Sequence, residues 1–359
     1  MTRQVSPRAW GLFLLLGLFV SPATAFSQIR MDERVVFFPT AARQSDDGQH
    51  WIATIHGWIH EPKEDNPLHD GAVRSLVQQI GGNPDLEEAR ILAERCRQFL
   101  ADNERGKDIR IRIAGKEHSL PPSDEGGHFS GEIRMASSDV ARFATGNRLV
   151  PQALTGRGDR RVFAGSVVLI PREGISVISD IDDTIKISEV RDHHKLMQNT
   201  FLREFQAVPG MSEAYRRWSA AGAEFHFVSS SPWQLYEALD EFAREAGFPP
   251  ATYHLKRFRL KDSSFLKLFA DPLTTKPPLI ESLLAAYPQR RFVLVGDSGE
   301  HDPEVYGLIA RRFPAQVAKV YIRDVTDEPA TSERYRQAFA HVPTDVWQIF
   351  TDPSVLELP

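Results

Sequence analysis

A short stretch at residues 174–186 restricts the fold of this chain more than any other part of its sequence. It reads Gly-Ile-Ser-Val-Ile-Ser-Asp-Ile-Asp-Asp-Thr-Ile-Lys, an apolar β-branched run that ends abruptly at carboxylates. A short run of this kind is typical of a buried parallel strand. Ligands of open α/β sheets bind beyond the carboxyl ends of the strands, and clustered carboxylates repel one another without a cation. The stretch therefore predicts a strand that ends in a site for a hard cation such as Mg²⁺.

The rest of the C-terminal half alternates between apolar strands and helical patterns. Strands are expected at 224–228, 252–258, 291–295 and near 318–322, and helices at 211–220, 233–246, 276–287, 302–312 and 331–340. This alternation predicts parallel βαβ units, and thus an α/β domain over residues 173–359. Ser231 and Pro232 are the expected N-cap and first residue of the helix at 233–246.

Polar residues stand at two more strand ends and at one helix start. Ser229 and Ser230 follow a strand and lead into a helix, where hydroxyl and N–H groups can hold an anion. Asp297 lies in a glycine-containing turn after another strand, which suits a hard cation. Lys276 opens a predicted helix and could neutralise a phosphate dianion. The combination indicates phosphoryl transfer, which depends on positioning and charge neutralisation.

The three strand-end aspartates receive separate roles. Asp180 is the expected nucleophile and forms an aspartyl-phosphate. Asp182 is expected to protonate the leaving alkoxide and then to activate the hydrolytic water. We expect Mg²⁺ to be held by Asp180, the backbone carbonyl of Asp182 and Asp297.

The phosphate is expected to contact hydroxyl groups and one lysine. Ser229 and Ser230 are the predicted substrate-binding serines, Thr184 orients the turn on the substrate side, and Lys276 is the predicted catalytic cation. The alternative to phosphate binding by Ser229 is that it caps a helix. The alternative for Lys276 is that it is a solvated lysine at the start of a helix. Asp302 either holds Lys276 or caps the helix that it opens, and both interpretations are open.

Four segments of the C-terminal half resemble a known family. They are Asp-Ile-Asp-Asp-Thr-Ile-Lys at 180–186, Val-Pro-Gly-Met at 208–211, Val-Ser-Ser-Ser-Pro-Trp-Gln-Leu-Tyr at 228–236 and Gly-Asp-Ser-Gly-Glu-His-Asp-Pro-Glu-Val-Tyr at 296–306. With Lys276 they match the haloacid dehalogenase motifs in order, and they look like the catalytic domain of actin-patch-type Mg²⁺-dependent phosphatidate phosphatases. The resemblance covers about residues 175–325. It implies a Rossmann-like three-layer α/β fold and the hydrolysis of phosphatidate to diacylglycerol and phosphate.

Two other functions fit the same catalytic groups. The substrate could be a soluble phosphomonoester, because function depends on the site and its cap more than on the fold. The chain could also be a phosphatidate-binding module without turnover. Asp182 argues against this last hypothesis, because the carboxylate for acid/base chemistry is present.

Two basic clusters leave the question of membrane contact open. The first cluster consists of Arg191, His193, His194 and Lys195. It either contacts a lipid headgroup or an anionic membrane, or forms a solvated helix face, and the second is commoner for charge runs. The second cluster alternates around Phe258 and Leu260 and consists of Lys256, Arg257, Arg259 and Lys261. It either borders the substrate phosphate or an anionic lipid surface, or protects an edge strand.

The N-terminal half, residues 26–172, is expected to be a mainly β, sandwich-like domain with a helical insertion. Strands are predicted at 34–39, 51–60, 109–113, 128–135 and 162–170, and two helices within 69–102 that are separated at 81–84, with Asn83 or Asp85 near the second start. The aromatic residues of this half are expected to pack in its core, with a carbohydrate- or lipid-binding face as the alternative. No catalytic constellation is evident there.

The first 25 residues are typical of a secretory signal peptide. Two arginines precede an apolar run at Trp10–Val20, and a small-residue cleavage pattern ends at Ala25. We therefore expect a periplasmic or secreted protein, with an uncleaved anchor as the alternative. The single cysteine, Cys96, excludes an intramolecular disulfide and is expected to be a buried thiol. A formal net charge of −5 argues against a nucleic-acid partner.

Overall fold

The computed structural model describes residues 29–63, 65, 67–81, 83–258 and 272–359. Its C-terminal half is built on a six-stranded sheet in which every pair of neighbours is parallel. In spatial order the strands are β13 (Ala251–Lys256), β12 (Glu224–Pro232), β11 (Ile175–Ser179), β14 (Arg291–Asp297), β15 (Val317–Arg323) and β16 (Trp347–Phe350). The chain starts in the middle with β11, runs outward to β13 and then returns to the other side of β11. The order reverses between β11 and β14, where ligands of open α/β sheets bind.

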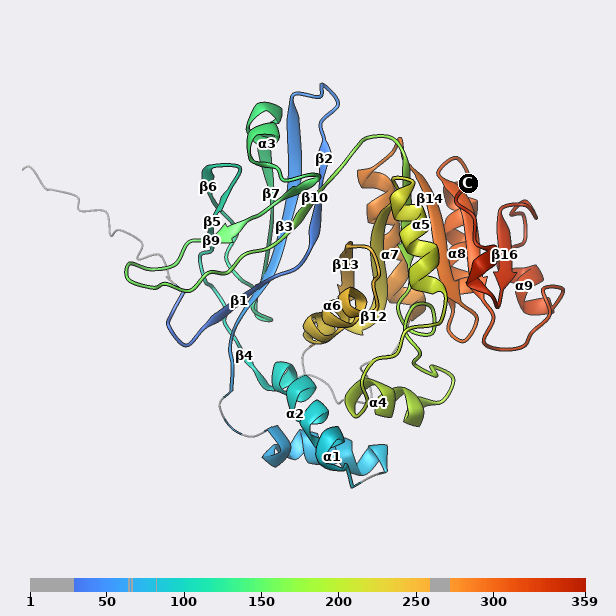
Figure 1. Cartoon of the computed structure of the whole chain (residues 1–359), viewed down its shortest axis with the longest axis horizontal. Helices are drawn as coiled ribbons and strands as arrows, with labels where there is room; N and C mark the ends of the chain where they lie inside the picture. The colour runs from blue at the N-terminus through green and yellow to red at the C-terminus, as the bar shows by residue number, and fades with distance from the viewer. Residues whose placement is uncertain (1–28, 64, 66, 82, 259–271) are drawn as a thin grey trace, which may run out of the picture.

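Helices cover this sheet on both faces (Figure 1). Val177 of β11 packs in one hydrophobic cluster with Tyr215, whereas its neighbour Ile178 packs in another with Ile280 and Tyr306. Successive strand residues point to opposite faces, so a run without polar interruptions is what a sheet covered twice requires. The helices are α4 (His193–Phe201), α5 (Met211–Ala220), α6 (Tyr236–Glu245), α7 (Pro272–Ala286), α8 (Asp302–Arg312) and α9 (Glu333–Ala338), with the 3-10 turns η2 (Trp233–Leu235) and η5 (Pro353–Val355).

Among the boundaries in this half that differ from the expected ones, three concern residues singled out in the sequence. Ser231 does not cap a helix, because β12 continues through it and Pro232 is the N-cap of η2. Lys276 does not open α7, which begins at Pro272 and places the lysine in its second turn. Strand β13 ends at Lys256, two residues before the expected end. The strand at 175 and the helix at 302–312 lie where they were predicted.

The N-terminal half contains two sheets. The larger has seven strands, β1 (Arg34–Phe37), β2 (Thr40–Gln44), β3 (His50–Glu61), β4 (Asp102–Asn103), β7 (His128–Ala136), β8 (Arg148–Leu149) and β10 (Val167–Ile170). The smaller has three strands, β5 (Arg110–Ile113), β6 (Lys116–Ser119) and β9 (Gln152–Ala153). Buried residues of both sheets, such as Ile55 and Ile111, share one hydrophobic cluster.

The strand expected at 162–170 is wrong for its first five residues. Ala164 makes an isolated bridge with Gln152 of the smaller sheet, and β10 pairs with β2 of the larger sheet only from Val167 onward. The chain changes sheets at Gly165, where a Cβ atom would lie 2.5 Å from the Cβ of Phe37. Strand β2 and the short helix α3 (Ser137–Phe143) were not predicted.

The helical insertion between β3 and β4 consists of η1 (Pro67–His69), α1 (Gly71–Ile80) and α2 (Leu86–Leu100). Asp85 caps α2 in a capping box with Glu88. The sequence had left Asn83 and Asp85 as the two candidates for this position. The two helices pack against α4 of the other half, as Figure 1 shows. Leu76 and the buried thiol Cys96 belong to the same hydrophobic cluster as Phe201 of α4. The insertion therefore joins the two halves of the chain.

Two sequence expectations fall on residues outside the described part. The predicted signal peptide at 1–25 is one, and Arg259 and Lys261 of the second basic cluster are the other. Within the described residues, no helix has both the length and the apolar character needed to cross a bilayer.

Candidate active site

The carboxyl ends of β11 and β14 bring the predicted aspartates together. Asp180 follows β11, its N–H donates to the carbonyl of Val295 on β14 (2.9 Å), and Asp297 is the last residue of β14. Both carboxylates are almost completely buried, with 1% and 0% of their surface exposed. The strand-end positions follow from the apolar runs, because each run must stay between the helical layers until its final residue.

Lys276 of α7 reaches the same place. Its buried Nζ lies 2.8 Å from Asp180 Oδ1, 2.5 Å from Asp302 Oδ1 and 3.1 Å from Glu300 Oε2. Burial alone would lower the pKa of Lys276, but the charges of Asp180 and Asp302 raise it well above its usual value. The lysine is thus a permanent cation, and its interpretation as a solvated residue is wrong. His301 is the N-cap of α8, so Asp302 holds the lysine and does not cap the helix.

Three carboxylates meet closely enough to hold one metal ion. Oxygen atoms of Asp180, Asp297 and Asp302 all lie within 4.8 Å of one another. Asp297 Oδ1 accepts from the N–H groups of Gly299 (2.6 Å) and Glu300 (3.1 Å), whereas Asp297 Oδ2 is buried and has no hydrogen-bond partner among the described residues. Such an atom is costly to bury unless a ligand satisfies it.

The ionisation of these carboxylates supports the same interpretation. Burial raises the pKa of Asp180 and Asp297 well above the usual value, and the neighbouring carboxylates of Asp302 and Glu300 raise it further. Lys276 opposes both effects but is one positive charge among several acids. The donor set and its excess of negative charge fit a hard divalent cation, which would stabilise the ionised forms.

Asp182 lies in the opposite electrostatic environment from Asp180. Its Oδ1 contacts Lys186 Nζ (2.8 Å) and accepts from the Ser188 hydroxyl (2.7 Å). Its Oδ2 accepts from the hydroxyls of Ser231 (3.0 Å) and Ser229 (3.3 Å). Burial alone would raise the pKa of Asp182, but Lys186 and these hydrogen bonds lower it. The environments favour a neutral Asp180 and an ionised Asp182, so a nucleophilic Asp180 needs the charge of a bound cation, and a proton-donating Asp182 needs a neighbouring anion.

The hydroxyl groups predicted to bind substrate occupy different places. Thr184 Oγ1 donates to Asp180 Oδ2 (3.3 Å), and Ser229 lies at Asp182 as described. The Ser230 hydroxyl is buried without a partner among the described residues. It points away from its two neighbours because side chains alternate along a strand. Ser231, expected as a helix cap, instead contacts the predicted acid/base carboxylate.

Sequence reasoning missed three residues of this site and one structural role. Lys186 and Ser188 surround Asp182, and Glu300 completes the lysine cage. Lys186 could have been noticed, because a lysine between isoleucines in an apolar segment needs a buried partner. Asp183, which had no role, accepts from the N–H groups of residues 188–190 and adopts a φ of 53°, so it shapes the loop after the turn.

One residue of each basic cluster contacts a neighbouring acid. Residues 191–195 are exposed, and Lys195 pairs with Glu189 at 2.7 Å. Arg257 contacts Asp124 of the N-terminal half. Strand β13, which ends one residue before Arg257, is an edge of the six-stranded sheet, and this favours the edge-strand interpretation of the cluster.

Known proteins are similar to the C-terminal segment of this chain. Residues 175–324 match the family described as phosphatidate phosphatase APP1, catalytic domain. The chain is 35% identical over 168 residues to phosphatidate phosphatase APP1 of Saccharomyces cerevisiae. This alignment covers 45% of this chain and 28% of the relative. It is 32% identical over 173 residues to an uncharacterized protein of Schizosaccharomyces pombe, with 47% and 28% covered. The chain thus spans about 28% of the length of these relatives.

Solved structures overlap weakly with the whole chain. A β-glucuronidase of Parabacteroides merdae overlaps with 86% of this chain and 34% of its own, at 8% identity and a TM-score of 0.26. So low a score carries no argument about the fold.

Proposed function

We propose that this chain is a Mg²⁺-dependent phosphatidate phosphatase that hydrolyses phosphatidate to diacylglycerol and phosphate. The observation that carries the proposal is the buried cluster of Asp180, Asp297 and Lys276 beside Asp182, inside the segment that matches a phosphatidate phosphatase catalytic domain. The central strands run outward from β11 on one side and from β14 on the other, which is the doubly wound order. This order supports a Rossmann-like domain of the haloacid dehalogenase type.

In the first half-reaction, Asp180 attacks the phosphorus atom of the monoester. One carboxylate oxygen forms the new P–O bond while the bond to the lipid oxygen breaks. Asp182 gives its proton to the departing alkoxide, which leaves as the hydroxyl of diacylglycerol. The arriving phosphate dianion favours the protonated form of Asp182, because a neighbouring negative charge raises a carboxyl pKa.

In the second half-reaction, Asp182 takes a proton from water. The water oxygen attacks the aspartyl-phosphate, the bond to the Asp180 oxygen breaks, and inorganic phosphate leaves. Lys276 stays charged throughout and lies at Asp180, where it can neutralise phosphoryl oxygens. Ser229 is the proposed hydroxyl donor to the same group, with Thr184 on the substrate side.

The proposed metal ligands are Asp180 and Asp297, with Asp302 close to both. The backbone carbonyl of Asp182 stays the predicted third ligand. When bound, Mg²⁺ would supply positive charge beside the transferring phosphoryl group. Asp297 Oδ2 is the free oxygen most suited to it.

The proposed setting is the periplasm or the secreted fraction, after cleavage behind Ala25. The substrate is then a phosphatidate or related lipid phosphate at an anionic membrane surface, and no nucleic acid is involved. The N-terminal segment motivates this proposal, and detection of the full-length, uncleaved chain in the cytosol would contradict it.

Phosphate release from phosphatidate in mixed micelles tests the function. We expect release with Mg²⁺, none in EDTA, and recovery when Mg²⁺ is added back. Asp180→Asn should lower release by on the order of 10⁴-fold, because the nucleophile is lost. Asp327→Asn is the matched control, an exposed aspartate at a φ of 56° that asparagine tolerates.

Two outcomes would redirect the proposal. Faster release from a panel of soluble phosphates than from phosphatidate would assign the phosphomonoester function. Tight phosphatidate binding without release by the wild-type chain would assign a binding module. Turnover by Asp180→Asn at the wild-type rate would contradict the assignment of Asp180 as the nucleophile.

A further inference from the structure

Lys186 is a buried cation whose surroundings extend away from the catalytic carboxylates. Its side chain is 2% exposed and contacts Asp182 on one side, with Nζ also donating to the Ser188 hydroxyl at 2.5 Å. On another side Nζ lies over the ring of Phe205, 4.8 Å from its centroid. An ammonium group has three N–H donors and no acceptor, so the electron-rich ring face takes the place of a further hydrogen-bond acceptor.

The ring of Phe205 is held beside Lys186 by backbone pairing. The N–H of Ile187 donates to Gln206 O (2.8 Å), and Lys186 forms an isolated bridge with Ala207. These bonds join the catalytic turn to the segment after α4. The position of the ring relative to the lysine is therefore fixed by the chain around it and does not depend on side-chain packing alone.

A second cation, from the helical insertion, holds the same ring. Arg95 of α2 places its guanidinium carbon 3.8 Å from the Phe205 centroid. The Arg95 side chain is only 6% exposed, and its Nη1 donates to the carbonyl of Thr200 near the end of α4 (2.5 Å). Arg95 Nη2 also lies 3.8 Å from Glu204. The arginine thus contacts both the ring and the segment that carries it.

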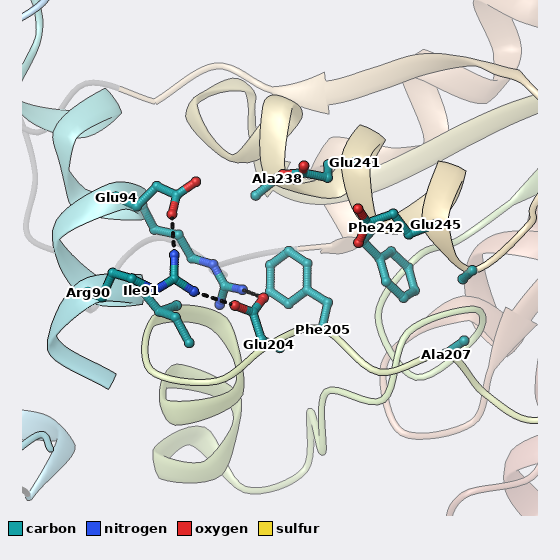
Figure 2. Close-up of a pocket in the computed structure, with 12 residues that line it drawn as sticks. Arg90, Ile91, Glu94, Glu204, Phe205, Ala207, Ala238, Glu241, Phe242 and Glu245 are labelled. Atoms are coloured by element: carbon teal, nitrogen blue, oxygen red, sulfur yellow. Dashed lines mark hydrogen bonds and ion pairs between the residues drawn. The ribbon is translucent and has the colours of Figure 1, made fainter. Parts of the chain in front are cut away.

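Phe205 lies at a pocket of about 500 Å³, between α2 and α6. Figure 2 shows the ring between Arg90 and Glu94 on one side and Phe242 and Glu245 on the other. Phe242 meets it edge-on, with centroids 5.9 Å apart. The pocket leaves room beside the ring.

We propose that Arg95 and Phe205 are positioning residues, which hold the ammonium group of Lys186 against Asp182. The helical insertion of the N-terminal half thereby sets the geometry of the predicted acid/base carboxylate, although it lies outside the matched segment 175–324. This inference rests on the proposed function, because it assigns a catalytic consequence to the place of Asp182.

Replacing the ring tests the proposal. Phe205→Leu keeps an apolar side chain but removes the ring face, and we expect kcat to fall about tenfold with KM unchanged, since a desolvated cation–π contact is of that size. Phe205→Tyr restores the face and should restore kcat. Phe242→Leu is the matched control: it loses a ring from the same pocket, and no cation lies over that ring in the described part of the chain.

Replacing the arginine tests the link to the insertion. Arg95→Met keeps the length of the buried side chain, and kcat should fall while Arg95→Lys retains most of it. Arg90→Met on the same helix removes exposed ion pairs with Glu87, Glu94 and Glu204 and should leave kcat unchanged.

Hydrogen–deuterium exchange of residues 183–190 gives a readout that does not require activity. We expect faster exchange there in Phe205→Leu and Arg95→Met, and wild-type exchange in Phe242→Leu, Arg90→Met and Phe205→Tyr. A wild-type chain that releases no phosphate defeats the proposed function, while exchange still decides the positioning role. Equal kinetics and exchange in Phe205→Leu and Phe242→Leu, or a change in KM alone, would overturn the inference.

Discussion

At the scale of single residues, two histidines of the N-terminal half, His56 (half-buried) and His128 (buried), contact the other half. His56 Nε2 lies 3.2 Å from His128 Nδ1, and the His56 ring meets Trp233 of η2 with centroids 4.8 Å apart. Burial, with Arg257 nearby, lowers the pKa of His128 to about 4, although Asp124 opposes the shift. One ring nitrogen must donate and the other accept, so the contact is lost when both rings are protonated.

Acid should therefore weaken the folded chain through His128. Between pH 6.5 and about 4 the unfolded chain binds a proton that the folded chain does not, so the free energy of unfolding falls as pH falls. Between pH 7 and pH 5 this one group should contribute a loss of about 2 kcal/mol. Urea unfolding at both pH values should show a steeper loss for the wild type than for His128→Gln. Parallel losses would contradict the assignment.

At the scale of elements, β14 and α8 approach each other so closely that only glycine fits between them. A Cβ atom at Gly296 would lie 2.3 Å from Asp302 Oδ2. Because Asp302 holds Lys276, this contact connects a packing constraint to the catalytic lysine. Gly307 is tight for a different reason, since its Cβ would lie 1.9 Å from the carbonyl oxygen of Ala338 in α9.

The two glycines give a matched pair of variants. Gly296→Ala and Gly307→Ala should each lower the free energy of unfolding by about 1–3 kcal/mol, because each overpacks a buried contact. Gly296→Ala should in addition lower the activity per folded molecule, since it displaces Asp302 from Lys276. Gly307→Ala should keep that activity. Urea unfolding combined with phosphate release measures both effects, and equal specific activities would contradict the link.

At the scale of the whole molecule, the two halves share one hydrophobic cluster. It contains Leu76 and Phe38 from the N-terminal half and Phe201 and Trp233 from the other. The rings of Phe38 and Trp233 lie with centroids 4.1 Å apart. The segment that matches the catalytic domain therefore exposes apolar surface when it is separated from residues 26–172.

A fragment of residues 173–359 should consequently fold poorly. We expect it to aggregate and to lack a sharp thermal transition, because the partners of Phe201 and Trp233 are missing. Size-exclusion chromatography and thermal unfolding beside the full chain measure this. A monodisperse fragment that melts cooperatively would show that the shared cluster is dispensable.

The residues at the strand ends were the part of the site that the sequence predicted best. An apolar run followed by Asp180 or Asp297 is a local pattern, so the strand, its sheet and the buried acids could be predicted from a few neighbouring residues. The sequence could not decide whether Asp302 holds Lys276, because that contact depends on how α7 and α8 pack. The contact of Arg95 with Phe205 joins residues far apart in the chain, and no local periodicity encodes it.

The helical insertion leaves and re-enters the large sheet at one place. Glu61 of β3 pairs with Asp102 of β4, and His60 pairs with Asn103, so the two ends of the excursion are hydrogen-bonded neighbours. The excursion is therefore attached to the sheet at a single point, and its length can change without breaking the register of the strands. Its packing against α4 and the contact of Arg95 with Phe205 are what fix its orientation toward the other half.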